Sequence, residues 1–383
     1  MRSLIAARRI APVPAPVHPL RLARLQWVPV LLAATTGALG CGEPPSAPAS
    51  LESPAQDETP VAPVVGAATV VADSYAVIGL GTLPGGTGSD AYGINRSRQV
   101  VGVSQTISAT GQLENHAFLW SNGVMRDLGN FGPIPAPGRA YSQALAINDA
   151  GKVVGEANRP DGEVHAFLWA NGTMQNLGTL GGQQSSAAAI NAAGQVVGYS
   201  TLAAAPGTNP ATHAFLWQNG AMRDLGTLGG EYSRAFGINS FGEIVGESRT
   251  AGGAIHAFRW ANGIMTDLMP QGGRSQALAI NRGGSVVGMW LSRAIFWVNG
   301  QPRLRGTAGE ISAATGINTA GLVVGTTQLN GVSRALIWKQ RVVSDLPAAN
   351  GGPALGQAYA INAGTDVAGV DFTTGQAVLW RHQ

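Results

Sequence analysis

The sequence predicts an all-β fold: a seven-bladed β-propeller of four-stranded antiparallel blades, with the ring closed by an N-terminal strand. The first observation is a repeat of about 45 residues, a length typical of one propeller blade. Each copy contains an Ile-Asn pair, and a glycine follows seven residues after the asparagine. The asparagines are Asn95, Asn148, Asn191, Asn239, Asn281, Asn318 and Asn362, and the glycines are Gly102, Gly155, Gly198, Gly246, Gly288, Gly325 and Gly369.

The second observation is a tryptophan that closes each copy, always with an alanine three residues before it. These residues are Trp120, Trp169, Trp217, Trp260, Trp297, Trp338 and Trp380. The third is an Asn-Gly pair, the strongest short hairpin signal, directly after this segment in five copies. It occurs at Asn122, Asn171, Asn219, Asn262 and Asn299. A β-solenoid, the other repeat architecture considered, has shorter coils and needs no such hairpins, so the propeller is favoured.

Residues 187–230 show how one copy divides into four strands. AAAIN is a short apolar strand, and Asn191 and Gly194 frame the tight turn that follows it. QVVGYS is the second strand, a loop of variable length leads to HAFLW, and AMRDL follows the hairpin as the fourth strand. Strands joined in this way predict an antiparallel meander, whose apolar inner strands must be covered on both faces.

Small residues mark the first strand of every copy. Alanine stands four places before each repeat asparagine, and only glycine or alanine stands two places before it. Large side chains would collide where the innermost strands of a propeller converge on its axis. The pattern therefore favours a radial arrangement of the blades.

Composition and charge bound the function classes. The chain has 383 residues, of which 12% are charged and 54 are glycine, which suits a Gly-rich all-β domain. Its net charge of +3 arises in the first 40 residues, where five of the 24 Lys and Arg lie and no acid does. The remainder has 19 basic residues against 21 acidic ones, so we expect no nucleic-acid partner.

Residues 1–40 have the pattern of a signal peptide, because arginines precede an apolar run, Trp27–Leu39, that is too short for a normal membrane span. Cys41, the only cysteine, follows Ala38-Leu39-Gly40, which resembles the lipobox of bacterial lipoproteins. The usual lipobox has leucine where this chain has Ala38, so an ordinary secretory signal is the alternative. Residues 41–72 are rich in Pro, Ala and Ser and predict a disordered tether. The propeller is expected over residues 73–383.

The two ends of the repeat region are complementary. YAVIGLGTLPGG, residues 75–86, matches the fourth strand and following turn of a copy, whereas the last copy stops shortly after Trp380. We therefore expect residues 75–83 to supply the outer strand of the blade built from residues 357–380. Such a closure leaves no open sheet edge.

The segments HAFLW (116–120, 165–169 and 213–217), HAFRW (256–260) and DLGTLGG resemble the HAF family of bacterial extracellular repeat proteins. The resemblance covers residues 75–383, although Arg293, Arg334 and Gln376 replace the histidine in the last three copies. It implies an exported, propeller-like repeat protein. It supplies no catalytic residue and no ligand.

Several motifs are expected to be structural. Four histidines, His116, His165, His213 and His256, share one repeat position, but equivalent positions in adjacent blades lie about 10 Å or more apart, too far for one metal ion. We expect no metal site and expect these histidines to pack or hydrogen-bond between blades. Asp127, Asp224, Asp267 and Asp345 recur before leucine in the fourth strand, and none has a fixed second carboxylate for glycoside hydrolysis. GTLGG lacks the Gly-Lys-Ser/Thr of a phosphate loop and predicts a turn between blades, and no cofactor is indicated.

One variable position points to a ligand site. Five residues before each repeat asparagine the copies present Asp90, Gln143, Ser186, Arg234, Gln276, Ala313 and Gln357. Tyr141 and Tyr232 lie just upstream, and Trp290 occupies a position that is usually Ser, Thr or Ala. These side chains are expected to form a ring at the mouth of a channel, with Trp290 and the tyrosines available for stacking. The alternative is a solvated rim without a ligand.

The leading hypothesis is an exported, lipid-anchored binding or interaction module of the bacterial envelope. It would be a monomer, attached to the membrane through lipid at Cys41, with an extracellular glycan or protein as its ligand. The alternatives are an extracellular hydrolase of a glycan or lactone and a purely structural envelope protein. An acid pair within about 10 Å at the channel mouth would favour the hydrolase, and a neutral polar and aromatic mouth would favour binding.

Overall fold

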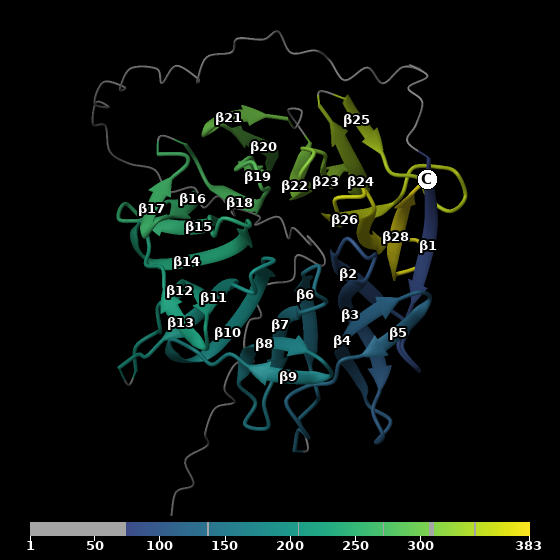
Figure 1. Ribbon diagram of the computed structural model, residues 1–383, viewed down its shortest axis with the longest axis horizontal. Coiled ribbons are helices and arrows are strands. Elements are labelled where there is room, and N and C mark those ends of the chain that lie inside the picture. Colours follow the sequence, from purple (N-terminus) through teal and green to yellow (C-terminus); the bar gives the residue numbers. More distant parts are fainter. Residues whose placement is uncertain (1–73, 136–137, 206, 271, 306–309, 341) are drawn as a thin grey trace, which may run out of the picture. The chain divides into compact units, whose positions relative to one another are not determined.

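The computed structural model describes residues 74–383 except 136–137, 206, 271, 306–309 and 341 (Figure 1). All of the described residues belong to one compact unit. The signal peptide, Cys41 and the tether lie outside the described residues. Within the described part every regular element is a β-strand. No helix in that part is long and apolar enough to cross a membrane.

The strands follow one another in the order that the repeat predicts. The first strands of the copies are β2 (Ser89–Ile94), β6 (Ser142–Ile147), β10 (Gly181–Ile190), β14 (Gly229–Ile238), β18 (Ser275–Ile280), β22 (Ile311–Ile317) and β26 (Gly356–Ile361). The second strands are β3 (Val100–Ile107), β7 (Val153–Asn158), β11 (Val196–Leu202), β15 (Ile244–Thr250), β19 (Val286–Trp290), β23 (Val323–Leu329) and β27 (Val367–Asp371).

The third and fourth strands complete the copies. The third strands are β4 (Leu113–Ser121), β8 (Val164–Ala170), β12 (Thr212–Gln218), β16 (Ile255–Ala261), β20 (Arg293–Val298), β24 (Val332–Lys339) and β28 (Gln376–His382). The fourth strands are β5 (Val124–Asp127), β9 (Thr173–Asn176), β13 (Ala221–Asp224), β17 (Ile264–Asp267), β21 (Gln301–Leu304) and β25 (Val342–Asp345). The remaining strand, β1 (Tyr75–Gly81), precedes all of these in the chain.

Among the described residues these strands form five four-stranded sheets and one eight-stranded sheet. The eight-stranded sheet consists of two four-stranded copies that are joined by one parallel pair, Thr212 with Tyr232. All pairing between the named strands of one copy is antiparallel, as in the register of Gly198 opposite Phe215. The prediction of an all-β fold built from four-stranded antiparallel sheets is therefore confirmed.

The first strand in the chain pairs with the last. β1 runs antiparallel to β28, with Tyr75 opposite His382 and Val77 opposite Trp380. First strands of successive copies also contact one another in order, and β26 contacts β2. Figure 1 shows these first strands towards the centre and the fourth strands, such as β17 and β21, at the periphery.

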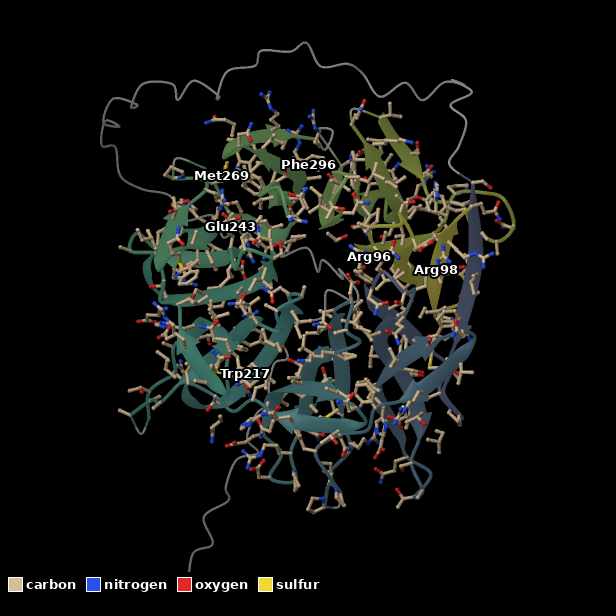
Figure 2. The ribbon with its side chains drawn as sticks, viewed as in Figure 1. Arg96, Arg98, Trp217, Glu243, Met269 and Phe296 are labelled. Atoms are coloured by element: carbon tan, nitrogen blue, oxygen red, sulfur yellow. The ribbon has the colours of Figure 1, made fainter. Side chains whose placement is uncertain are left out.

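The repeat asparagine joins each copy to the next. Asn191 Oδ1 accepts a hydrogen bond from the backbone nitrogen of Gln195 at 3.0 Å, which closes its turn, and Nδ2 donates to the backbone oxygen of Asn239 at 3.1 Å. The same link follows through every repeat asparagine, and Asn362 donates to Asn95 at 3.0 Å. Arg98, labelled in Figure 2, adds a bond of 3.0 Å to Asp366 of the last copy.

The hydrophobic core lies between neighbouring sheets. In one cluster Val154 and Ala166 of one copy pack with Ala187, Phe215 and Trp217 of the next. The closing tryptophans and the alanines three residues before them are buried because they fill these contacts. The Asn-Gly hairpins have the expected left-handed backbone, with φ of 52° at Asn219 and 82° at Gly220.

One turn is shorter than the sequence predicts. GTLGG was expected to lie wholly in a turn between blades, but β10 begins at Gly181 and β14 at Gly229. The register shifts between Gly181 and Ser185, and Gly181 has φ of 102°. The glycines thus allow the strand to begin within this segment, with an irregular register over its first residues.

Candidate functional site

The variable position of the first strand faces a second variable position that the sequence analysis missed. In the antiparallel register, the residue five places before each repeat asparagine lies opposite the residue after the repeat glycine. These opposite residues are Val103, Glu156, Tyr199, Glu247, Met289, Thr326 and Val370. The signal was available, because this position also varies from copy to copy beside an invariant glycine.

The repeat glycine brings the two strands close together. A Cβ atom on Gly198 would lie 1.9 Å from the backbone oxygen of Ser186, and one on Gly155 would lie 1.9 Å from that of Gln143. The other repeat glycines have the same contact at 1.9–2.0 Å. Their role is thus close backbone approach, since none of them has a positive φ.

These positions, with nearby tyrosines, make up what we call the central cluster. Its members are Asp90, Tyr92, Tyr141, Gln143, Glu156, Ser186, Tyr199, Tyr232, Arg234, Glu247, Gln276, Gln357 and Tyr359. About half of them are partly buried and the others are buried, including Glu156 and Glu247, which are only 4% and 3% exposed. The cluster therefore places polar and aromatic groups around two buried acids.

Glu156 is held by two neutral donors. Its Oε1 accepts hydrogen bonds from the Tyr141 hydroxyl at 2.8 Å and from Gln143 Nε2 at 2.9 Å. Both donors come from the residues at and just upstream of the position that the sequence analysis singled out. Tyr141 and Gln143 are thus brought together, as expected, but around an acid that was not foreseen.

Glu247 links two copies of the repeat. Its Oε1 accepts a hydrogen bond from the Tyr232 hydroxyl, and its Oε2 accepts one from Gln276 Nε2 at 2.7 Å. Gln276 belongs to the next copy, so this carboxylate lies where two first strands adjoin. Both of its oxygens are engaged by neutral donors.

Arg234 lies between two tyrosine rings. Its guanidinium carbon is 4.4 Å from the centroid of the Tyr199 ring and 5.0 Å from that of Tyr232. Such distances allow cation–π attraction with both rings. The guanidinium group is thereby held on the Glu247 side of the cluster.

Asp90 lies on the opposite side with two further tyrosines. The rings of Tyr92 and Tyr359 meet edge to face with centroids 5.3 Å apart, and the Tyr359 hydroxyl donates to Gln357 Oε1 at 2.5 Å. Burial and the nearby carboxylate of Asp90 raise the pKa of Tyr92. These contacts join the first copy to the last, because Tyr92 belongs to β2 and Tyr359 to β26.

Burial raises the pKa of all five tyrosines of the cluster above its ordinary value of 10.0. The carboxylate of Glu156 raises it further for Tyr92, Tyr141 and Tyr199, which places these side chains around that acid. Every hydroxyl in the cluster therefore stays protonated at neutral pH. The tyrosines act as hydrogen-bond donors and not as bases.

Three residues expected in the ring at the channel mouth do not place a polar group in the central cluster in the way the sequence predicts. Ser186 is completely buried, and its hydroxyl oxygen has no hydrogen-bond partner among the described residues. Ala313 is 7% exposed and carries no polar group. Trp290 packs against the cluster of Val245, Met269 and their neighbours between sheets, and its indole nitrogen is buried without a hydrogen-bond partner among the described residues. We leave Trp290 out of the central cluster.

The repeated histidines form pairs within their own sheets. His116 Nδ1 lies 2.7 Å from Asp127 Oδ2, and His256 Nδ1 lies 2.7 Å from Asp267 Oδ2, in each case between the third and fourth strands of one copy. The expected bonding between blades is therefore wrong for these pairs, because the register places the two side chains on one face of a sheet. In the part of the chain that the structure describes, no three His, Cys, Asp or Glu side chains are grouped to hold a metal ion.

Comparison with known proteins concerns the fold alone. No family model and no curated protein matches the chain. Among solved structures, a puromycin-hydrolyzing peptidase of Mycobacterium tuberculosis is 14% identical, with a TM-score of 0.49 over 77% of this chain and 53% of that one. TolB from Acinetobacter baumannii is 12% identical, with a TM-score of 0.41 over 76% and 63% of the two chains.

A third match is the β-propeller domain of the Trilobed protease from Pyrococcus furiosus, 10% identical, with a TM-score of 0.42 over 69% of this chain and 99% of that one. The chain spans about half the length of the peptidase and less than two thirds of TolB. At these identities and TM-scores the likenesses carry no argument about activity or ligand.

Proposed function

We propose that residues 73–383 form a seven-bladed β-propeller, closed as a ring by β1, that serves as an extracellular binding module with its ligand at the central cluster. The closure is supported by the pairing of β1 with β28 and by the hydrogen bond from Asn362 to Asn95. Deleting residues 75–81 tests it, since β28 would then present an open edge. We expect oligomers in gel filtration, and an unchanged monomer of unchanged stability would refute the closure.

One observation carries the binding function: side chains from several copies meet in one hydrogen-bonded cluster that solvent still reaches. Gln276 bonds Glu247 of the preceding copy, and the Tyr92 and Tyr359 rings join the first and last copies. A site assembled at the junction of rigid strands is suited to holding a ligand in a fixed orientation. Aromatic groups with a few placed polar groups are the usual lining of such sites.

A hydrolase is less well supported. Both oxygens of Glu247 accept bonds from Tyr232 and Gln276, and Glu156 is held by Tyr141 and Gln143. These hydrogen bonds hold both acids as acceptors of neutral donors, and a tyrosine with a raised pKa is no nucleophile at neutral pH. No observation on the described residues favours catalysis over binding.

The first 73 residues support a proposal about where the protein is located and how it is attached. We propose an exported, monomeric member of the HAF repeat proteins, anchored to the bacterial envelope through lipid on Cys41, with a glycan or protein as partner and no nucleic acid. The support is the leader, the HAFLW and DLGTLGG segments and the acid excess after residue 40. Intact-mass measurement of the exported protein should show an acylated Cys41, and a free thiol there would contradict the anchor.

Ligand screening tests the binding site. The full chain is screened by thermal shift against glycans, amines and small metabolites, beside the variants Tyr92→Leu and Phe241→Ser. Tyr92 belongs to the central cluster, whereas Phe241 is 70% exposed in a turn beside a repeat asparagine and serves as the control. We expect Tyr92→Leu alone to abolish the shift. A ligand that still shifts the melting temperature of both variants would place the binding site elsewhere.

A further inference from the structure

The negative charge of Glu156 points to a positive charge on the ligand. Glu156 is 4% exposed, and both hydrogen bonds that it accepts from described residues end on Oε1. No Lys, Arg or His among those residues forms an ion pair with it, in contrast to Glu243, which pairs with Arg259. A buried carboxylate is costly unless an opposite charge compensates it.

The arginine of the cluster does not supply that charge. Arg234 stacks on Tyr199 and Tyr232, and Arg234 and Arg274 both oppose the effect of Glu247 on the pKa of Tyr232. Arg234 also opposes the effect of Glu156 on the pKa of Tyr199, but no ion pair joins Glu156 to a described Lys, Arg or His. Among the described residues, Glu156 is therefore hydrogen-bonded by neutral groups alone and has no ion-paired base.

The groups around Glu156 suit an organic cation better than a metal ion. Tyr141 and Gln143 donate hydrogen bonds to it, and Tyr92 and Tyr199 lie near enough for its charge to raise their pKa. Metal ions need several oxygen ligands, and no group of three acidic or histidine side chains is present among the described residues. Aromatic faces beside a carboxylate attract an alkylammonium group through cation–π and Coulomb terms together.

We propose that the central cluster binds an alkylammonium group, held at the free side of the Glu156 carboxylate beside Tyr92, Tyr141 and Tyr199. This inference rests on the proposed binding function and names its ligand class. The group can belong to a free amine or to a methylated lysine side chain of a protein. The two sources share one chemistry and differ in affinity, since a peptide adds contacts outside the cluster.

Calorimetry on the full chain tests the charge. Choline chloride is compared with 3,3-dimethylbutan-1-ol, its neutral carbon isostere, and with a peptide that carries trimethyllysine. We expect choline to bind and the alcohol not to bind. A peptide that binds more tightly than choline would identify a protein source, whereas equal or weaker binding would identify a free amine.

Variants separate charge from structure. Glu156→Gln keeps an acceptor for Tyr141 and Gln143 but removes the charge, and it should weaken choline binding at least about tenfold. Glu163→Gln removes one acid of the same copy outside the cluster, where it pairs with Arg159, and should leave binding unchanged. Tyr92→Phe should retain more affinity than Tyr92→Leu, because phenylalanine keeps the aromatic face.

Other outcomes overturn the proposal. If the alcohol binds as well as choline and Glu156→Gln does not weaken choline binding, the ligand is not recognised by its charge. If Tyr92→Leu then loses binding of both choline and the alcohol, the central cluster is still the binding site. If choline and the peptide fail to bind at millimolar concentrations, the alkylammonium class is refuted. The broader screen then decides separately whether the central cluster binds anything.

Discussion

The side chain of Asn362 donates a hydrogen bond to the backbone oxygen of Asn95, a residue 267 positions earlier in the chain, at 3.0 Å. The same bond links each repeat asparagine to the next copy at 3.1–3.3 Å. One residue type therefore closes its own turn and also fixes the neighbouring copy. This dual use explains why no other residue stands at these positions within the chain.

Replacing Asn362 by alanine should lower the free energy of unfolding by about 2 kcal/mol, because the buried backbone nitrogen of Asp366 and the oxygen of Asn95 would lose their partner. Urea denaturation measures the change. Asn191→Ala removes the same bonds in the middle of the repeat and is the matched comparison. If only Asn191→Ala lowers the free energy of unfolding, the hydrogen bond between the first and last copies contributes nothing to stability.

The repeat glycine should not tolerate even one added methyl group. In Gly198→Ala the new Cβ would lie 1.9 Å from the Ser186 backbone oxygen, so strands β10 and β11 must separate, and we expect a loss of about 3 kcal/mol. Gly79→Ala is the control, since a Cβ there meets nothing within 4 Å, and it should change stability by less than about 0.5 kcal/mol. Equal melting temperatures for the two variants would refute close approach as the role of Gly198.

Trp290 should contribute to stability and not to ligand binding. It packs on the apolar cluster that contains Val245 and Met269, so Trp290→Ala should cost about 2 kcal/mol by leaving a cavity. Thermal unfolding and calorimetry with choline are measured on the same samples. A variant with unchanged stability and weakened binding would return Trp290 to the ligand site.

The pair of His116 and Asp127 predicts a pH dependence of stability. The hydrogen bond from His116 to Asp127 raises the pKa of the histidine above 6.5, although burial opposes it. Burial alone would raise the pKa of Asp127, but the bonds from His116 and Gly129 outweigh it and lower that pKa below 3.8. The histidine's contribution is complete below pH 6.5 and is lost as pH rises through its raised pKa, whereas the contribution of Asp127 is lost only as pH falls below 3.8.

His116→Gln measures this contribution. The stability difference between the wild-type protein and the variant should be largest between pH 3.8 and 6.5 and should shrink above that range. It should stay below about 1 kcal/mol, because the Asp127 side chain is 41% exposed and solvent screens the pair. A difference that grows from pH 6.5 to 8 would contradict the predicted direction.

Much of the local architecture could be predicted from spacing alone. The Asn-Gly pairs predicted hairpins at Asn122 and Asn219, and both asparagines have φ near 50°. The ends of the repeat predicted that residues 75–83 pair with the last copy, and β1 covers Tyr75–Gly81 of that range. Such features are local properties of glycine and asparagine, or follow from counting strands, so they need no knowledge of packing.

The candidate site could be predicted only in part. Gln143 and Gln276 were singled out by their variability, but their hydrogen-bond partners, Glu156 and Glu247, were not. Each partner follows a repeat glycine, and it faces the site only because the antiparallel register places it opposite the first strand. Trp290 packs against an apolar cluster, and the pattern of residue types does not say which face of a strand a side chain takes.

The sequence by itself determined the repeat, the strand order, the turns and the need for small residues where strands converge, because each depends on the conformational preferences of a few adjacent residues. Only the tertiary structure decided that Gln276 reaches Glu247 of another copy, that Arg234 lies between Tyr199 and Tyr232, and that Glu156 is bonded by Tyr141 and Gln143. These relationships depend on the twist and contact of separate sheets. Residues dozens of positions apart acquire a common electrostatic environment only when those sheets pack around one centre.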